Sequence, residues 1–326
     1  MTNIIPKKLK KGDHVRIIAP SRGAKIIGHD VRKIAEERFK KLGLSVSYGR
    51  YTTDDNWDLL GTSPVNDRLF DLKDAFHDPE VDAIFTIIGG FNSNQLLPFI
   101  NYELIARCPK ILCGFSDITV LLNAIYAKSR LVTFLGPHFS SIGMLKGCDY
   151  TIDNMVKMLM EDGQTTLEPS QEWSDDAWFI DQENRNFIKN DGYWWLSEGE
   201  GEGTLLGGNL GSFNLLLGTP FCPEFDRDTI LMIEDTAASD ITDFMRNLTA
   251  LIYQKGFGNV RGLLIGRFQK GSQVTREQLE YVIKSLGINH IPVVANLDFG
   301  HSTPLMTLPV GGNVVIKDKK ITVKVG

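Results

Sequence analysis

Residues 110–128, KILCGFSDITVLLNAIYAK, contain a strand, a turn and a helix in direct succession. The apolar run at 110–115 predicts a buried strand, and the apolar spacing over 117–128 predicts a helix. A second apolar run at 131–135 predicts the next strand. Because a helix that joins two neighbouring strands normally leaves them parallel, this stretch indicates a βαβ unit.

The same alternation extends back to the N-terminus. Strands are predicted at 14–20, 44–48 and 81–88, and helices at 31–42, 66–76 and 94–105. Continuous apolar strands that alternate with helices are typical of a parallel sheet covered on both faces. We therefore expect residues 1–145 to form an N-terminal α/β domain with a doubly wound, mostly parallel sheet.

Residues 203–326 carry a second α/β pattern, which we expect to form a C-terminal domain that ends in antiparallel strands. The predicted helices span 209–217, 241–254 and 276–286, and the predicted strands span 229–233, 262–265 and 292–296. The tail 313–325 alternates apolar and polar residues, which predicts a hairpin that turns near Asp318 and Lys319.

The stretch between these domains, residues 146–202, is polar yet rich in tryptophan. It contains four of the five tryptophans of the chain, Trp173, Trp178, Trp194 and Trp195. A flexible linker does not concentrate this much aromatic surface. We therefore expect a crossing segment with a tryptophan-rich loop, whose rings either bind a ligand or pack at an interface between domains or subunits.

Composition excludes several classes of protein. Hydrophobic residues make up 42% and charged residues 23% of the 326, which excludes wholesale disorder. A net charge of −5 argues against a nucleic-acid polymer as partner, because such binders usually present a basic face. No apolar run approaches the roughly 18 residues that a membrane-spanning helix needs, so we expect no membrane association.

The cysteines show neither paired CxxC spacing nor the spacing of a metal finger. They are Cys108, Cys113, Cys148 and Cys222. Scattered cysteines in a chain long enough to bury a large core predict reduced core residues of a cytoplasmic protein. The basic residues 1–11 are followed by a polar stretch rather than an apolar one, so we expect no signal peptide. The sequence therefore predicts a cytoplasmic protein.

Two turns that follow strands in the N-terminal half contain residues suited to catalysis, since α/β folds bind ligands beyond the carboxyl ends of their strands. Gly89 and Gly90 let backbone N–H groups approach a bound oxygen closely, although such a turn also has a purely structural use. Ser116 fits either the N-cap of a helix or a nucleophile assisted by the helix N-terminus.

A serine nucleophile needs a base, and the base needs an acid that orients it. His301 lies in the loop after the strand 292–296, and Glu234 directly follows the strand 229–233. Both positions also allow structural roles, because a loop histidine is commonly inert and a carboxylate after a strand commonly caps the next helix. In chain order the three candidates are Ser116, Glu234 and His301, each at a strand end.

This combination resembles the serine LD-carboxypeptidase family and, within it, the microcin C immunity (MccF-like) branch. The resemblance covers nearly the whole chain and rests on GGFNSN at 89–94, GFSD at 114–117, GEGEGTLLGGN at 199–209, IED at 233–235 and FGH at 299–301. Members that act on cell-wall peptides usually have Arg-Gly-Gly-Tyr-Gly at the glycine turn, whereas this chain has IGGFN at 88–92. That difference favours the immunity branch.

The resemblance implies a serine-type carboxypeptidase, a hydrolase with Ser116 as nucleophile, His301 as general base and Glu234 as the residue that fixes the imidazole tautomer. It implies an oxyanion hole built from the backbone N–H groups of Gly90 and Asp117. By the same likeness we expect no metal and no cofactor, and a homodimer.

The candidate substrate-binding residues are Phe91, Asn92, Trp178 and Phe179. Nucleobases stack well on flat aromatic rings, so we expect Trp178, with Phe179 as the second candidate, to stack on the base of a nucleotide substrate.

The immunity branch implies a small substrate, a peptidyl- or aminoacyl-nucleotide toxin of the microcin C type, cleaved through an acyl-enzyme in self-immunity. The alternative within the family is an LD-carboxypeptidase that removes the terminal D-residue of murein tetrapeptides in peptidoglycan recycling. A non-enzymatic alternative is a small-molecule binding or sensor module, in which Ser116 is a cap and His301 an ordinary loop residue.

Overall fold

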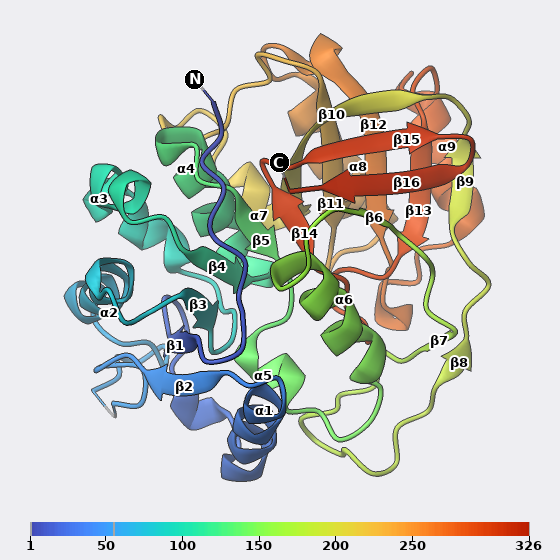
Figure 1. Cartoon of the computed structure of the whole chain (residues 1–326). Helices are drawn as coiled ribbons and strands as arrows, with labels where there is room; N and C mark the ends of the chain where they lie inside the picture. Colours follow the sequence, from blue (N-terminus) through green and yellow to red (C-terminus); the bar gives the residue numbers. More distant parts are fainter. Residues whose placement is uncertain (1, 55, 326) are drawn as a thin grey trace.

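The computed structural model describes residues 2–54 and 56–325, which form two large sheets and a small two-stranded ribbon with helices packed around them (Figure 1). The N-terminal sheet has the order β14-β5-β4-β3-β1-β2, parallel except that β14 is antiparallel to β5. Its strands are β1 (His14–Ile18), β2 (Ser45–Tyr48), β3 (Ala83–Thr86), β4 (Ile111–Gly114), β5 (Thr133–Leu135) and β14 (Leu308–Val310). The predicted doubly wound, mostly parallel sheet is confirmed.

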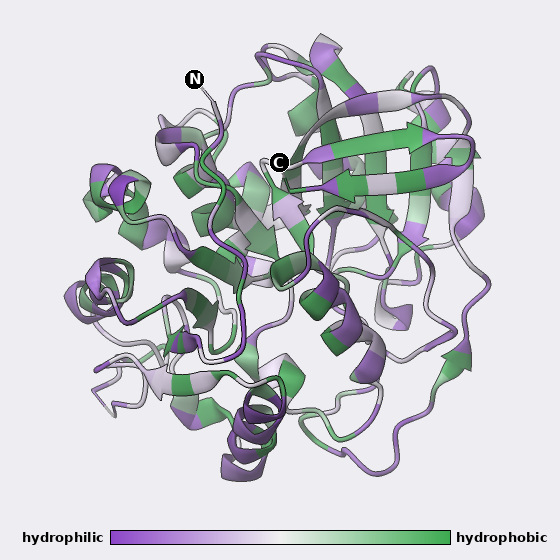
Figure 2. Ribbon diagram, in the orientation of Figure 1, coloured by the Kyte–Doolittle hydropathy of each residue, from purple (hydrophilic) through white to green (hydrophobic). Residues whose placement is uncertain are grey.

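Helices cover both faces of this sheet, with α2, α3 and α4 on one side and α1 and α5 on the other (Figure 1). They are α1 (His29–Lys41), α2 (Val65–His77), α3 (Tyr102–Arg107), α4 (Thr119–Ser129) and α5 (Phe139–Ile142), with 3₁₀ turns η1 (Ala24–Ile26), η2 (Ser93–Phe99) and η3 (Ser116–Ile118). Apolar residues concentrate on the strands, while the outer faces of helices such as α1 are hydrophilic (Figure 2).

The single helix predicted over 94–105 is wrong, because the structure divides this stretch into η2 and α3. Pro98 lacks the N–H that a continuing α-helix needs. Asn101 then begins a new helix, since its side-chain oxygen accepts a hydrogen bond from Leu104 N at 3.0 Å.

The C-terminal sheet has the order β6-β16-β15-β10-β11-β12-β13-β9. Its central strands β10 to β13 are parallel, and antiparallel strands flank them. The strands are β6 (Gln164–Thr166), β9 (Trp194–Ser197), β10 (Gly201–Asn209), β11 (Thr229–Glu234), β12 (Val260–Gly266), β13 (Val293–Leu297), β15 (Asn313–Lys317) and β16 (Lys320–Lys324). The predicted antiparallel end is confirmed, and the hairpin turns at Asp318 and Lys319, both with positive φ.

The crossing segment is built into the C-terminal sheet, since β6 and β9 are its two edge strands. The segment also contains α6 (Asp149–Leu159) and the small ribbon β7 (Glu172–Trp173) with β8 (Ile188–Lys189). The remaining helices are α7 (Leu210–Asn214), α8 (Ile241–Ile252) and α9 (Arg276–Ser285), with 3₁₀ turns η4 (Phe257–Asn259) and η5 (Lys270–Ser272). Within residues 2–54 and 56–325, no helix has the length and apolar character needed to cross a bilayer.

Helix α4 joins the two sheets through buried hydrogen bonds to β10. The Asn123 side chain donates to Gly207 O at 2.8 Å and accepts from Gly207 N at 3.0 Å. One turn earlier, Thr119 Oγ1 accepts from Asn209 N at 2.9 Å. Because β10 pairs with β11, these bonds hold the start of α4 beside the carboxyl end of β11.

A buried ion pair anchors the crossing segment to the end of β13. Arg267 Nη1 lies 2.6 Å from Asp298 Oδ1, and both side chains are buried. The Asp298 carboxylate also accepts hydrogen bonds from the backbone N and the Oγ of Ser170, at 2.8 and 2.7 Å. One carboxylate therefore fixes a strand end and residue 170 of the crossing segment together.

We expect Asp298→Ala to lower the free energy of unfolding by about 3–5 kcal/mol, because it leaves the Arg267 charge buried without its partner. Urea denaturation measures this loss. Glu280→Ala is the control: it removes the half-exposed Arg276–Glu280 pair and should cost no more than about 0.5 kcal/mol. Equal losses for the two variants would contradict a structural role for the buried pair.

Candidate active site

Ser116 lies on the turn that joins β4 to α4, in a conformation that non-glycine residues seldom adopt. Its φ is +59°, in the left-handed region, and it opens the 3₁₀ turn η3 that leads into α4. Such conformations persist where the surrounding structure imposes them, and they are frequent at functional sites. The turn leaves Ser116 half-buried at the carboxyl end of the N-terminal sheet.

The structure brings Ser116, His301 and Glu234 together in one hydrogen-bonded line. Ser116 Oγ lies 3.0 Å from His301 Nε2, and Glu234 Oε2 lies 2.7 Å from His301 Nδ1. An ionised carboxylate can only accept, so Nδ1 carries the ring proton and Nε2 is free to accept the hydroxyl proton. The imidazole side chain is 20% exposed, which leaves it accessible from solvent.

Glu234 is the buried end of this line, at the last residue of β11. Its side chain is 1% exposed, and its Oε1 has no hydrogen-bond partner among the described residues. Gly300 makes room for the carboxylate, because a Cβ at that position would lie 2.7 Å from Glu234 Oε2. The glycine before His301 therefore allows the close approach of acid and imidazole.

Opposing effects act on the pKa of His301. Burial by itself lowers it, but the charge and hydrogen bond of Glu234, together with the charge of nearby Asp235, raise it by more. The pKa therefore lies above the usual value of a histidine, roughly 6.5. Asp235 itself is buried, and this burial raises the pKa of its carboxyl.

The Gly89-Gly90 turn lies directly against the nucleophile. A Cβ on Gly89 would lie 3.1 Å from Ser116 Cβ and 3.2 Å from Ser116 Oγ, so a side chain there would press against the serine. Within the part of the chain that the structure describes, the backbone N–H groups of Gly90 and Asp117 make no hydrogen bond. Two unpaired donors therefore flank the serine.

Asn92, expected to bind substrate, is instead 6% exposed and occupied by internal hydrogen bonds. Its Oδ1 accepts from Ser21 Oγ and Arg68 Nη1, and its Nδ2 donates to Thr62 Oγ1. A side chain with its amide engaged in this way supports the turn from behind, and direct contact of Asn92 with a substrate stays a prediction. The neighbouring Phe91 is exposed, with the Arg22 guanidinium over its ring.

Trp178 and Phe179 line a cavity of about 240 Å³ next to the imidazole, together with Phe115, Met144 and His301. Phe179 is 73% exposed, and the two rings meet edge to face with centroids 6.0 Å apart. The other three tryptophans of the crossing segment have structural contacts. Trp173 lies under Arg267, while Trp194 and Trp195 belong to β9 and pack against the core.

Sequence reasoning missed two polar residues of this region. Asn209 ends β10 opposite Glu234, and its buried Nδ2 has no described partner. Its only sequence signal was its place at the end of a glycine-dense run. His138 lies under Phe115, with ring centroids 4.3 Å apart, and its Nδ1 is 2.7 Å from Thr86 Oγ1. Burial, with a smaller effect of His301, lowers the pKa of His138 to about 3, so this second imidazole is neutral.

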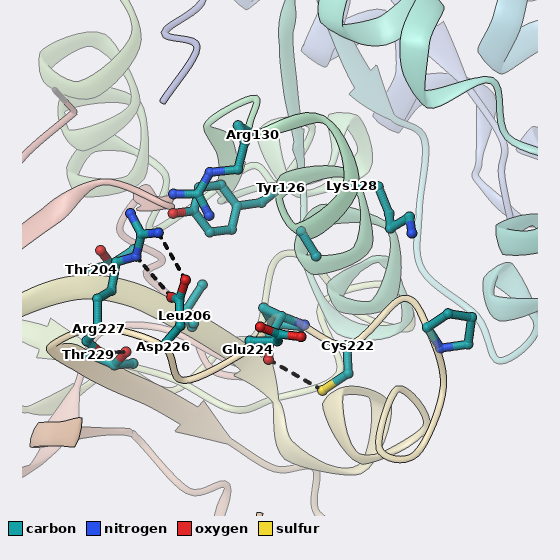
Figure 3. A pocket seen from close by; sticks show the side chains of 13 residues that line it. Tyr126, Lys128, Arg130, Thr204, Leu206, Cys222, Glu224, Asp226, Arg227 and Thr229 are labelled. Atoms are coloured by element: carbon teal, nitrogen blue, oxygen red, sulfur yellow. Dashed lines mark hydrogen bonds and ion pairs between the residues drawn. The ribbon is translucent and has the colours of Figure 1, made fainter. Parts of the chain in front are cut away.

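A second cavity, of about 230 Å³, lies between the end of α4 and the strands β10 and β11 (Figure 3). None of the three residues of the hydrogen-bonded line borders it. Arg227 pairs with Asp226 at 3.0 Å, and Arg130 lies over the Tyr126 ring and donates to Asn3 at 2.8 Å. Both arginines of this cavity thus have partners within the protein. No group of three or more His, Cys, Asp or Glu in residues 2–54 and 56–325 is arranged to hold a metal ion.

An alcohol, an imidazole and a buried carboxylate in line, next to free N–H groups, make an arrangement suited to hydrolysis through an acyl-enzyme. Comparison with known proteins agrees with this class. Residues 15–136 match the LD-carboxypeptidase N-terminal domain, and residues 202–316 match the LD-carboxypeptidase C-terminal domain. The chain therefore belongs to the LD-carboxypeptidase family, peptidase family S66, and is a carboxypeptidase-type hydrolase.

Three curated relatives span nearly the whole chain. The putative carboxypeptidase YocD of Bacillus subtilis is 46% identical over 95% of both chains. The microcin C7 self-immunity protein MccF of Escherichia coli is 30% identical over 96% of this chain and 93% of its own. The probable murein peptide carboxypeptidase of Bacillus subtilis is 31% identical over 98% and 93%.

Solved structures place the chain among MccF-like proteins. The MccF-like protein from Bacillus anthracis superposes with a TM-score of 0.95 at 43% identity, over 98% of this chain and 99% of that one. MccF in complex with glutamyl sulfamoyl guanosine superposes with a TM-score of 0.88 at 28% identity, over 98% of both chains.

We expect the His301 imidazole to titrate above the ordinary histidine value, and Glu234→Gln to lower its pKa, because the substitution removes the carboxylate charge that favours the imidazolium. NMR titration of the ring nitrogens measures both values. His138 serves as an internal control, since it should stay neutral well below pH 5 in both proteins. An unchanged His301 titration in the variant would contradict the charge interaction between Glu234 and His301.

Proposed function

We propose that this protein cleaves an acyl bond with Ser116 as nucleophile, His301 as general base and Glu234 as the residue that orients the imidazole. The single observation that carries the proposal is that one imidazole bonds both to the Ser116 hydroxyl, at 3.0 Å, and to the buried carboxylate, at 2.7 Å. A loop histidine without function has no reason to join two such groups from separate sheets.

The reaction follows from these contacts. Ser116 Oγ attacks the substrate carbonyl while its proton passes to His301 Nε2, and Glu234 stabilises the imidazolium. The N–H groups of Gly90 and Asp117 donate to the oxyanion that forms. His301 then protonates the leaving group, which departs and leaves the acyl group on Ser116. A water gives its proton to His301 as it attacks the ester, and Ser116 recovers its proton as the acid leaves.

The proposed substrate is a peptidyl- or aminoacyl-nucleotide of the microcin C type, whose cleavage would detoxify it. The cavity beside His301 supports this choice, because Trp178 and Phe179 offer flat rings for a nucleobase. MccF, similar over nearly the whole chain, has been solved with an aminoacyl sulfamoyl nucleoside. We assign Trp178 as the stacking ring, with Phe179 second, and Phe91 as a further substrate contact.

We further propose that the protein is cytoplasmic and forms a homodimer. Light scattering at working concentration measures its mass in solution and so tests the dimer.

The alternative substrate is a murein tetrapeptide, from which the enzyme would remove the terminal D-residue. The similarity to the probable murein peptide carboxypeptidase of Bacillus subtilis favours this alternative. The glycine turn IGGFN argues against it, since family members with that activity usually carry Arg-Gly-Gly-Tyr-Gly there.

We expect Ser116→Ala to lower kcat by at least about a thousandfold, because it removes the nucleophile and leaves only binding and electrostatic effects. Steady-state kinetics on the cleaved substrate measure the loss. Ser285→Ala, at an exposed site on α9, is the control and should retain wild-type kcat. Substantial turnover by Ser116→Ala would reject the acyl-enzyme mechanism, and undiminished ligand affinity with no turnover in either protein would favour a binding module.

The substrate assignment is tested with an aminoacyl sulfamoyl adenylate and an L,D-linked tetrapeptide, each incubated with the wild-type protein. We expect cleavage of the adenylate, and we expect Trp178→Ala to raise KM for it about tenfold or more, since a base–aromatic stack contributes about 1–3 kcal/mol. Trp194→Ala, on the edge strand β9, is the matched control. Rapid hydrolysis of the tetrapeptide alone would reject the nucleotide substrate.

A further inference from the structure

A buried arginine stands behind the proposed oxyanion hole. Arg68, in the first turn of α2, is 3% exposed. All three of its guanidinium nitrogens donate to neutral oxygens: Nε to Ser63 O at 2.9 Å, Nη1 to Pro20 O at 3.0 Å, and Nη2 to Gln95 Oε1 at 2.7 Å. Nη1 also donates to the backbone O and the side-chain Oδ1 of Asn92, both at 3.2 Å.

No carboxylate of residues 2–54 and 56–325 forms an ion pair with this guanidinium. Burial lowers the pKa of Arg68, while the charges of Asp58 and Asp117, neither of which forms an ion pair with it, raise that pKa by less. A buried cation without a direct counter-ion is costly, so such a group is seldom retained for packing alone.

Arg68 acts on the glycine turn through Asn92 and Ser21. Ser21 Oγ donates to Asn92 Oδ1 at 3.1 Å and accepts from Phe91 N at 3.1 Å. Ser21 also sits where a Cβ of Gly90 would be, because that atom would lie only 2.1 Å from its Oγ. The Ser21 hydroxyl therefore holds the N–H group of Phe91. Arg68 in turn donates to the same Asn92 oxygen that accepts from this hydroxyl.

The far end of the turn is tied to the nucleophile's helix. Ser93 N donates to Asp117 Oδ2 at 2.9 Å, and Ser93 Oγ donates to Asp117 O at 2.8 Å. Hydrogen bonds thus engage Phe91, Asn92 and Ser93 in succession, while the N–H groups of Gly90 and Asp117 stay free. The network fixes the direction of both free donors relative to Ser116.

We infer that Arg68 is a positioning residue of the proposed reaction, which holds the Gly90 and Asp117 N–H groups in place and adds a buried positive charge behind the developing oxyanion. The inference rests on the proposed function. Catalysis gains only from interactions that are stronger in the transition state, and a fixed cation behind the donors meets this condition because the carbonyl oxygen gains its negative charge there. Arg68 does not touch the substrate.

The test compares Arg68→Met, Arg68→Lys and Ser21→Ala with wild type on whichever substrate the wild-type enzyme cleaves. We expect Arg68→Met to lower kcat about a hundredfold with KM changed less than about threefold, the size of effect known for lost oxyanion donors. Arg68→Lys keeps the charge but loses the planar fork, so we expect partial recovery of kcat. Ser21→Ala should lower kcat about tenfold. Binding of the substrate in a Ser116→Ala background should be unaffected by adding Arg68→Met.

Arg16→Met is the matched control. Arg16 lies on β1 of the N-terminal sheet, is largely buried, and pairs with Asp74 and Asp78, away from the glycine turn. It should lower the melting temperature but leave kcat near wild type. If a folded Arg68→Met keeps kcat, or if its loss equals that of Arg16→Met, the inference is wrong. Should Arg68→Met not fold, unchanged kcat in both Arg68→Lys and Ser21→Ala overturns it. Turnover by Ser116→Ala, in contrast, overturns the proposed function itself.

Discussion

The His301 imidazole bonds to a side chain from each of the two large sheets. Its Nε2 lies against Ser116, which belongs to the N-terminal sheet, and its Nδ1 bonds to Glu234 on the C-terminal sheet. A shift of about 1 Å between the sheets would break one of these bonds. The buried hydrogen bonds from Asn123 and Thr119 of α4 to β10 therefore do more than fill an interface. They fix the distance between Ser116 and Glu234, which the imidazole has to bridge.

Several costly features concentrate within the same small volume. Ser116 adopts a positive φ, and Glu234 Oε1 and Asp235 Oδ2 are buried without described partners. Arg68 is a buried cation without an ion pair to any described residue. Each lowers stability when considered alone. Elsewhere in the core Arg267, which is as deeply buried as Arg68, is paired directly with Asp298. The slightly less buried Lys110 and Arg185 donate to backbone oxygens. The concentration of such groups beside Ser116 agrees with the proposed reaction, in which charge develops at this place.

Local sequence patterns predicted most helices and strands, but not the elements and side-chain positions that depend on residues far away in the chain. Helices and parallel strands of both domains follow from apolar spacing, and the strand-end positions of Ser116, Glu234 and His301 follow from the same pattern. Strand β10 was missed because its glycines give no alternation of side chains, and β14 was missed because its partner, β5, lies far away in the chain. Local sequence also gave no sign that Asn92 faces inward, since the residues that hold it come from separate segments.

The crossing segment is attached beside the proposed reaction centre at a point separate from the tip of its loop. Ser174 and Thr303 exchange backbone hydrogen bonds at 2.8 and 2.7 Å, two residues away from His301. These bonds hold the segment beside the imidazole, and Trp178, four residues after Ser174, lines the cavity next to His301. Because the anchor at Ser174 is separate from the tip of the loop, residues at the tip can change without displacing His301. Substitutions at the tip of this loop can therefore change the proposed substrate contact while the hydrogen-bonded line from Ser116 to Glu234 stays in place.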